Sequence, residues 1–212
     1  MKLLAVDTAL GACSVAILDG DAVLAHVFEP MERGHAEALA PMVENAMRDA
    51  EIGFAALDRL AVTTGPGTFT GQRVGLAFMR GLRVALHKPL LGVTTLAAMG
   101  HQAMAETGLA AFAALHDARR DEVYLQMSGM DDPAVLGFAD ALQAILRLDG
   151  RFALAGTAAP MAATRLSNGV LSAVHQPDAL WVARLAQALP DSDVAPRPLY
   201  LRNPDAKLPA AR

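Results

Sequence analysis

The chain has 212 residues, of which 53% are hydrophobic and 19% charged, and its formal net charge is −4. This length can bury the core of one large domain or two small ones, and the composition excludes a disordered chain. The acidic balance disfavours tight independent binding of nucleic acid. Cys13 is the single cysteine, so no internal disulfide can form, and no apolar run approaches the ~20 residues of a membrane span. We therefore expect a cytoplasmic protein.

Strand-forming residues open the chain in three short runs, at 3–10, 13–20 and 21–29, separated by a glycine turn and an Asp-Gly-Asp turn. These runs predict an antiparallel meander. Apolar residues at helical spacing then predict a helix over 35–50, with a bend near Pro41. After it, the pattern predicts a strand over 58–65, a glycine-rich loop, a helix over 72–88, a strand over 88–95 and a helix over 95–107.

The pattern restarts near residue 109. We predict a strand, an Asp-containing turn and a second strand over 109–130, then a helix over 139–148, a strand over 151–158 and a helix over 177–189. The tail over 190–212 is rich in proline, which excludes a regular helix and predicts an extended arm.

This internal duplication predicts an α/β fold with mixed sheets and flanking helices, built as two subdomains of ββ(β)αβα type. We place the N-terminal subdomain at 1–106 and a smaller, degenerate C-terminal subdomain at 107–189. The tail over 190–212 can lie on the first subdomain or reach a partner.

The loop GPGTFTGQR, residues 65–73, looks like a phosphate cradle. It lacks the lysine that a Walker A loop places after Gly71, and its glycines do not have the Rossmann spacing. Two readings remain open from the residues alone. The loop can hold an anion at the start of the next helix, or it can only shape a strand-to-helix turn.

A nucleotide site would also need carboxylates at the strand ends, and each half has one. Asp7 ends the first strand and Asp117 ends its counterpart, but the second hairpin, HDARRDEV, has no glycine. Such a site would be vestigial, and its candidate residues are Asp7, Thr8, Gly67, Thr68 and Asp117. We expect no metal site, because the histidines are scattered and no Cys-x-x-Cys or H-E-x-x-H occurs.

The helix after the glycine loop has two contrasting faces. Gly71 and Gly75 notch an apolar face, which another helix could approach closely, or which the chain's own core could cover. Arg73, Arg80 and Arg83 lie on the other face. That arginine stripe is compatible with acidic partner residues, with RNA phosphate or with water alone.

Five stretches in order carry a resemblance: LLAVDTALGACSVAILDG, GPGTFTGQRVGLA, GVTTLAAMG, DARRDEVYLQ and PLYLRNPDAK. They resemble the TsaB family, bacterial tRNA threonylcarbamoyladenosine biosynthesis proteins, over almost the whole chain. The resemblance implies the ASKHA fold (acetate and sugar kinase, heat-shock protein, actin) and a paralogue of the catalytic subunit TsaD. TsaD carries a metal-binding H-x-x-x-H, whereas here the aligned stretch runs from His35 to Leu39 and lacks the second histidine.

The resemblance further implies a non-catalytic scaffold subunit. It implies binding to TsaD through helices 35–50 and 71–87, docking of the ATPase TsaE on that heterodimer, and a homodimer when TsaD is missing. The complex places threonylcarbamoyl beside the anticodon of tRNAs that read ANN codons, and this subunit meets tRNA only through the complex. No cofactor is implied for this subunit, because the complex uses ATP and Mg²⁺ through its partners.

On the two implied helices we expect the partner contact at Leu39, Val43, Met47, Gly71, Val74, Gly75, Phe78 and Leu82. Two alternatives remain. One is an independent ASKHA-type ATPase or small-molecule kinase that uses Asp7 and the loop over 65–71. The other is a peptidase, for which the sequence offers neither metal ligands nor a Ser-His-Asp spacing.

Overall fold

A five-stranded mixed sheet forms the first half of the protein. The computed structural model describes residues 1–201, so Pro204, Pro209 and the rest of the predicted arm over 202–212 lie outside the described residues. The strands are β1 (Lys2–Asp7), β2 (Ala12–Asp19), β3 (Ala22–Pro30), β4 (Arg59–Gly65) and β5 (Leu90–Thr94), in the spatial order β3-β2-β1-β4-β5. As predicted, β1 to β3 form an antiparallel meander, and β4 and β5 run parallel to β1.

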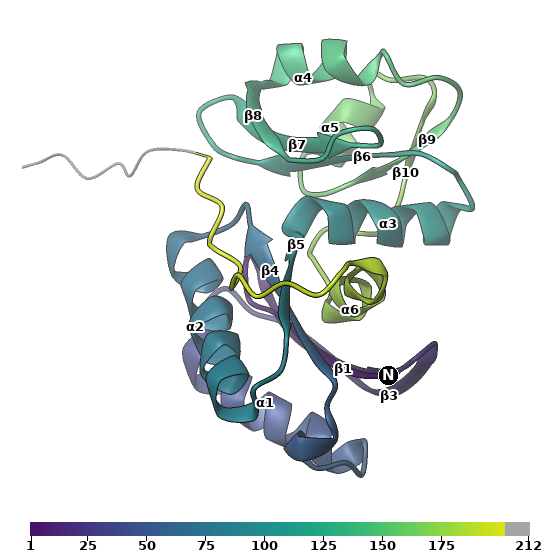
Figure 1. Ribbon diagram of the computed structural model, residues 1–212. Coiled ribbons are helices and arrows are strands. Elements are labelled where there is room, and N and C mark those ends of the chain that lie inside the picture. The colour runs from purple at the N-terminus through teal and green to yellow at the C-terminus, as the bar shows by residue number, and fades with distance from the viewer. Residues whose placement is uncertain (202–212) are drawn as a thin grey trace, which may run out of the picture.

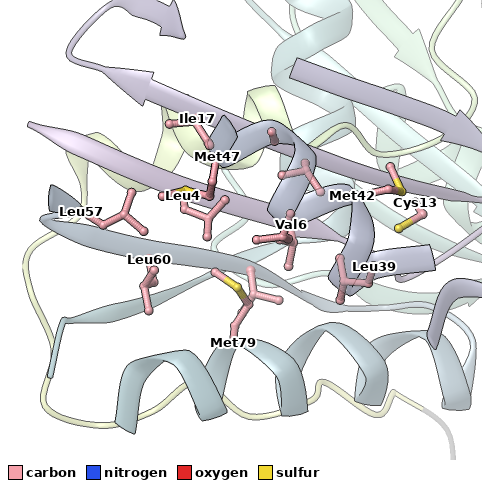
Figure 2. Close-up of a cluster of buried hydrophobic side chains, with 14 of the residues drawn as sticks. Leu4, Val6, Cys13, Ile17, Leu39, Met42, Met47, Leu57, Leu60 and Met79 are labelled. Carbon is pink, nitrogen blue, oxygen red and sulfur yellow. The ribbon is translucent and has the colours of Figure 1, made fainter. Parts of the chain in front are cut away.

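Helices cover both faces of this sheet, because its central strands are apolar on both sides. Leu4 and Val6 of β1 pack under α1 (His35–Asp49), which continues through Pro41, and under α2 (Phe69–Leu86). Figure 2 shows this cluster, with Met79 of α2 pointing at the sheet. A short 3-10 helix, η1 (Phe54–Ala56), lies between α1 and β4. Leu3 and Ala5 point to the opposite face, where they pack on α6 (Ala179–Ala188).

The second half repeats this plan with a second five-stranded sheet. Its strands are β6 (Phe112–Asp117), β7 (Glu122–Met127), β8 (Ala134–Gly137), β9 (Phe152–Ala155) and β10 (Gly169–Leu171), in the order β10-β9-β6-β7-β8. Side chains of β6 alternate between two helical layers: Phe112 and Ala114 face α3 (Thr95–Thr107), while Ala113 and Leu115 face α4 (Phe138–Ile145) and α5 (Ala159–Ala163). Figure 1 shows α3 and α6 between the two sheets and α4 on the far side.

This duplicated architecture confirms the prediction of an ASKHA α/β fold with two mixed sheets and flanking helices. Helix α6 lies within the predicted second subdomain at 107–189, but it packs on the sheet of the first half, which corrects that boundary. Val182 and Ala183 of α6 are buried against the first sheet, so α6 belongs to that half of the molecule. Among residues 1–201, no helix is long and apolar enough to cross a membrane.

Candidate functional site

A cleft of about 860 Å³ opens between the two halves, within the size range of small-molecule sites. One wall is the loop before α2 and its first turn, including Gly67, Thr68 and Phe69. The opposite wall comes from the ends of β6 and β9, and the tail closes one side. The lining residues from these strand ends and from the tail are His116, Asp117, Arg119, Thr157, Leu199, Tyr200 and Leu201.

Three of the five predicted nucleotide-site residues, Gly67, Thr68 and Asp117, line this cleft. Asp117 is exposed, and its Oδ1 accepts a hydrogen bond from the Arg119 amide at 2.7 Å. The hairpin turn beside it has no glycine, yet Arg119 adopts a left-handed φ of 63°. Nearby, burial lowers the pKa of His116 to about 4, so this imidazole is neutral at physiological pH.

Asp7 does not reach the cleft, which corrects its predicted place in a nucleotide site. Its residue is 0% exposed, and its Oδ1 accepts hydrogen bonds from Thr63 Oγ1 at 2.5 Å and from the Ala9 amide at 3.2 Å. Its other oxygen, Oδ2, is buried and makes no hydrogen bond with the described residues. Burial raises the pKa of this carboxyl to about 7, so the group is far less charged than an ordinary aspartate.

Thr8 is equally buried and connects β1 to α2. Its Oγ1 donates to the carbonyl of Gly71 at 2.7 Å and accepts from the amide of Gly75 at 3.0 Å. Both of these groups belong to α2, so the hydroxyl satisfies helix backbone and does not face a ligand. The predicted role of Thr8 in an anion site is therefore also corrected.

The glycines of the GPGTFTGQR loop have a packing role. A Cβ on Gly67 would lie 2.3 Å from the Ala9 carbonyl oxygen, and one on Gly71 would lie 2.2 Å from the Thr8 carbonyl oxygen. Only glycine permits such an approach of backbone to backbone. Thr68 caps α2 by accepting the Gly71 amide at 3.0 Å. The loop therefore seats α2 tightly on the turn after β1, which favours the second of the two sequence readings.

The residues predicted for the partner contact face this chain's own core. Leu39, Val43 and Met47 are 1%, 0% and 4% exposed and pack under the first sheet. Gly71 and Gly75 pack directly against Thr8. The remaining three, Val74, Phe78 and Leu82, are half-buried against the same cluster. The apolar and glycine-notched stripes are thus covered within the chain, and the expected contact at the five buried residues does not fit the structure.

A different stripe of α2 faces solvent. Ala77 and Gly81 are exposed, Val84 is 69% exposed, and a Cβ on Gly81 would find no atom within 4 Å. The three residues are spaced i, i+4, i+7 and therefore share one face of the helix. The sequence pattern already marks Ala77, Gly81 and Val84 as small or apolar residues between the two faces, but the expected contact residues were placed on the more apolar face that the sheet covers. The signal for the exposed face was the run of small side chains among the arginines.

The arginine stripe of α2 binds the tail. Arg83 Nη2 donates to the Asp193 carbonyl at 2.5 Å, and Arg80 donates to the Pro196 carbonyl through Nε at 3.2 Å and also through Nη2. Arg73 Nε donates to the Tyr200 hydroxyl at 2.7 Å. The tail, yellow in Figure 1, therefore runs from α6 past β5 towards the N-terminal end of α2.

An exposed aromatic pair lies where the tail reaches the cleft. Phe69 and Tyr200 are stacked with centroids 5.7 Å apart, and the Arg73 guanidinium lies 3.5 Å from the centroid of the Phe69 ring. Neither aromatic residue was among the predicted site residues. Their positions, one at the start of α2 and one in the PLYLR motif, are 131 residues apart by number, so nothing local in the sequence joins them.

Cys13 is a core residue, and we expect its thiol to be unreactive in the native protein. It is 0% exposed in the cluster under α1, and burial raises its pKa to about 12, so almost no thiolate forms at neutral pH. Ellman's reagent should give no signal with native protein at pH 8 and one thiol per chain after unfolding in guanidinium. Fast labelling of the native chain would contradict this packing.

Metal ligands do not gather in the described part of the chain: residues 1–201 contain no group of three or more His, Cys, Asp or Glu side chains that could hold an ion. His35, which the sequence aligned with a metal-binding motif, is buried, and its Nε2 lies 3.0 Å from the Leu10 carbonyl oxygen.

Comparison with known proteins gives matches over both sequence and structure. Residues 23–154 match the family model described as TsaD, tRNA N6-adenosine threonylcarbamoyltransferase. The chain is 39% identical over 124 residues to the tRNA threonylcarbamoyladenosine biosynthesis protein TsaB of Escherichia coli K12, covering 58% of this chain and 53% of that protein. It thus spans about half the length of such relatives.

Two further relatives match along nearly their whole length. An uncharacterized protein of Mycobacterium tuberculosis H37Rv is 36% identical, over 97% of this chain and 93% of that one. The solved structure of YeaZ from Pseudomonas aeruginosa superposes with a TM-score of 0.73 at 32% identity, covering 88% of this chain and 91% of that chain.

Proposed function

Because the chain belongs to the TsaB/YeaZ family, we propose that it takes part in tRNA threonylcarbamoyladenosine biosynthesis as a subunit that binds TsaD and does not itself transfer the threonylcarbamoyl group. TsaE docks on the resulting heterodimer, and ATP and Mg²⁺ act through these partners. A homodimer through the same surface forms when TsaD is missing.

The exposed stripe on α2 is the observation that carries the proposal. Ala77 and Gly81 have almost no side chain, so a helix of the partner can approach the α2 backbone closely. Val84 supplies an exposed apolar group beside them. An interface on this face would bury about 1,600 Å² in total, as stable protein complexes commonly do.

The state of Asp7 favours this subunit role over the alternative of an independent ATPase or kinase. Such an enzyme needs a charged carboxylate at the nucleotide to hold Mg²⁺ or to orient water. Asp7 is fully buried with a raised pKa, and of the two strand-end carboxylates only Asp117 lines the cleft. Magnesium-dependent ATP hydrolysis by the pure chain, lost in Asp117→Ala, would instead support the alternative.

Gly81→Trp tests the partner face. We expect this variant to keep the native melting temperature, because the position is open, and to lose association with the TsaD of the same organism by about 100-fold, since an indole would hold the helices apart. Light scattering and calorimetric titration measure the complex. Ala105→Trp on the exposed side of α3 is the matched control and should bind normally. Normal binding by Gly81→Trp would refute this interface.

A further inference from the structure

We propose that the edge of α2 that carries the tail is a docking surface for a single-stranded segment of RNA, with phosphates on Arg73, Arg80 and Arg83 and a base on the Phe69–Tyr200 pair. The proposal rests on the proposed role in tRNA modification and adds to it a direct contact between this subunit and the RNA.

The three arginines carry positive charge that no ion pair among residues 1–201 compensates. Their acceptors among residues 1–201 are two backbone carbonyls and a phenol hydroxyl, all neutral, and none of the three forms an ion pair there. Arg59, by contrast, pairs with Asp191 at 2.6 Å. Guanidinium groups that bind neutral acceptors keep their full charge and can attract an anion.

The tail orders these side chains before any ligand arrives. Each guanidinium is tied to the tail by at least one nitrogen, while other N–H groups remain for a second acceptor, since an arginine has five donors. A ligand then need not fix three long side chains, which lowers the entropy cost of binding.

The length of the arginine stripe matches a short stretch of a nucleic-acid strand. Residues 73 and 83 are separated by about 15 Å along the helix axis, at about 1.5 Å per residue. Nucleic-acid strands carry one phosphate per about 3.4 Å of axis, so the stripe matches about four nucleotides. A line of spaced cations suits a repeating polyanion better than a single small anion.

The aromatic pair at the end of the stripe favours RNA over an acidic protein surface as the occupant. Phe69 is 53% exposed and Tyr200 is 44% exposed, and both lie at the end of the arginine stripe. Exposed aromatic rings beside arginines bind unpaired bases by stacking, with the backbone held by the cations. An acidic peptide would use the arginines and leave the rings without a role.

The test measures binding of the isolated full-length chain to a fluorescent, unmodified tRNA transcript from 50 to 300 mM salt. The triple variant R73Q/R80Q/R83Q is expected to weaken binding by about 30-fold at 50 mM salt. It should also reduce the salt slope by about 2, because each lost phosphate contact removes about 0.7 from the slope. The control R147Q/R151Q/R165Q, which removes three exposed arginines elsewhere, should bind as the native chain does.

A charge-retaining variant distinguishes RNA contact from anchoring of the tail. R73K/R80K/R83K keeps the cations but loses the guanidinium hydrogen bonds to the tail, so it should keep the native salt slope, whereas hydrogen exchange of the tail should rise in both triple variants. Tyr200→Leu should weaken binding by about 10-fold without changing the slope.

Several results would overturn the proposal: no RNA binding by the native chain at 50 mM salt, equal loss in the Lys and Gln triple variants, or competition by poly-glutamate as strong as by RNA. Because the measurement uses the isolated chain, it is independent of TsaD. RNA binding that survives in Gly81→Trp, together with lost TsaD association, would show that the two surfaces are separate.

Discussion

Replacing Asp7 with Asn is expected to remove a loss of stability that the native protein suffers as pH rises from about 4 to about 7. The carboxyl is fully buried, and burial raises its pKa from 3.8 to about 7 in the folded state. The neutral carboxyl is therefore the form that suits the site, and an amide of the same shape imitates it at every pH. Thr63 and the Ala9 amide can still donate to the amide oxygen.

The direction of the effect follows from proton linkage. Below pH 3.8 the carboxyl is protonated in both the folded and the unfolded chain, and its contribution to stability is fully present. Between 3.8 and about 7 only the folded chain keeps the proton, so stability falls by about 1.4 kcal/mol per pH unit. The total loss is about 4 kcal/mol, and it levels off above pH 7.

Urea unfolding at pH 5 and pH 8 measures this effect. From about pH 5 to about pH 8, the free energy of unfolding of the native chain should fall by a few kcal/mol more than that of Asp7→Asn. Asp132→Asn, which replaces an exposed carboxyl between β7 and β8, is the control and should follow the native curve. Parallel pH dependence in the native chain and Asp7→Asn would mean that Asp7 is not buried as described.

Gly71→Ala is expected to destabilise the protein by about 3 kcal/mol or to prevent folding. Its Cβ would lie 2.2 Å from the Thr8 carbonyl oxygen and 2.6 Å from Thr68 Oγ1. Thr8 is 0% exposed and fixed by two hydrogen bonds to α2, so it cannot move aside cheaply. The helix would have to shift away from the sheet and lose its cap.

The same helix provides the control. Gly81→Ala adds the same methyl group where no atom lies within 4 Å, so it should stabilise the protein by about 0.5–1 kcal/mol through helix propensity. Thermal and urea unfolding of both variants give the comparison. If Gly71→Ala were as stable as the native chain, α2 would not be seated on the turn after β1.

Much of the fold could be read from the sequence. The alternation of apolar residues predicted the opening meander, and helical spacing predicted α1, α2, α3, α4 and α6. Three short elements, β8, α5 and β10, were not predicted; they have 4, 5 and 3 residues. Elements this short have too few residues to show a period, and they form because the neighbouring strand or helix completes their hydrogen bonds and packing.

The candidate site was harder to predict, because its residues come from distant parts of the chain. Gly67, Thr68 and Asp117 were expected together and do line one cleft. Asp7 had the same sequence signal as Asp117, a carboxylate at the end of a strand. Asp7 is 0% exposed and accepts a hydrogen bond from Thr63, 56 positions along the chain, whereas Asp117 is exposed at the cleft, so tertiary packing decides which carboxyl is buried.

The sequence by itself determined the family, through its GPGTFTGQR and PLYLR motifs, and the identity and order of the long elements, because these depend on local spacing. Only the tertiary structure decided which face of α2 is covered. Periodicity divides a helix into faces, but the burial of a face depends on which strands and segments fold against it. Here β1 and the turn after it cover the glycine-notched face, and the tail binds the arginines. The small residues Ala77 and Gly81 remain exposed beside Val84.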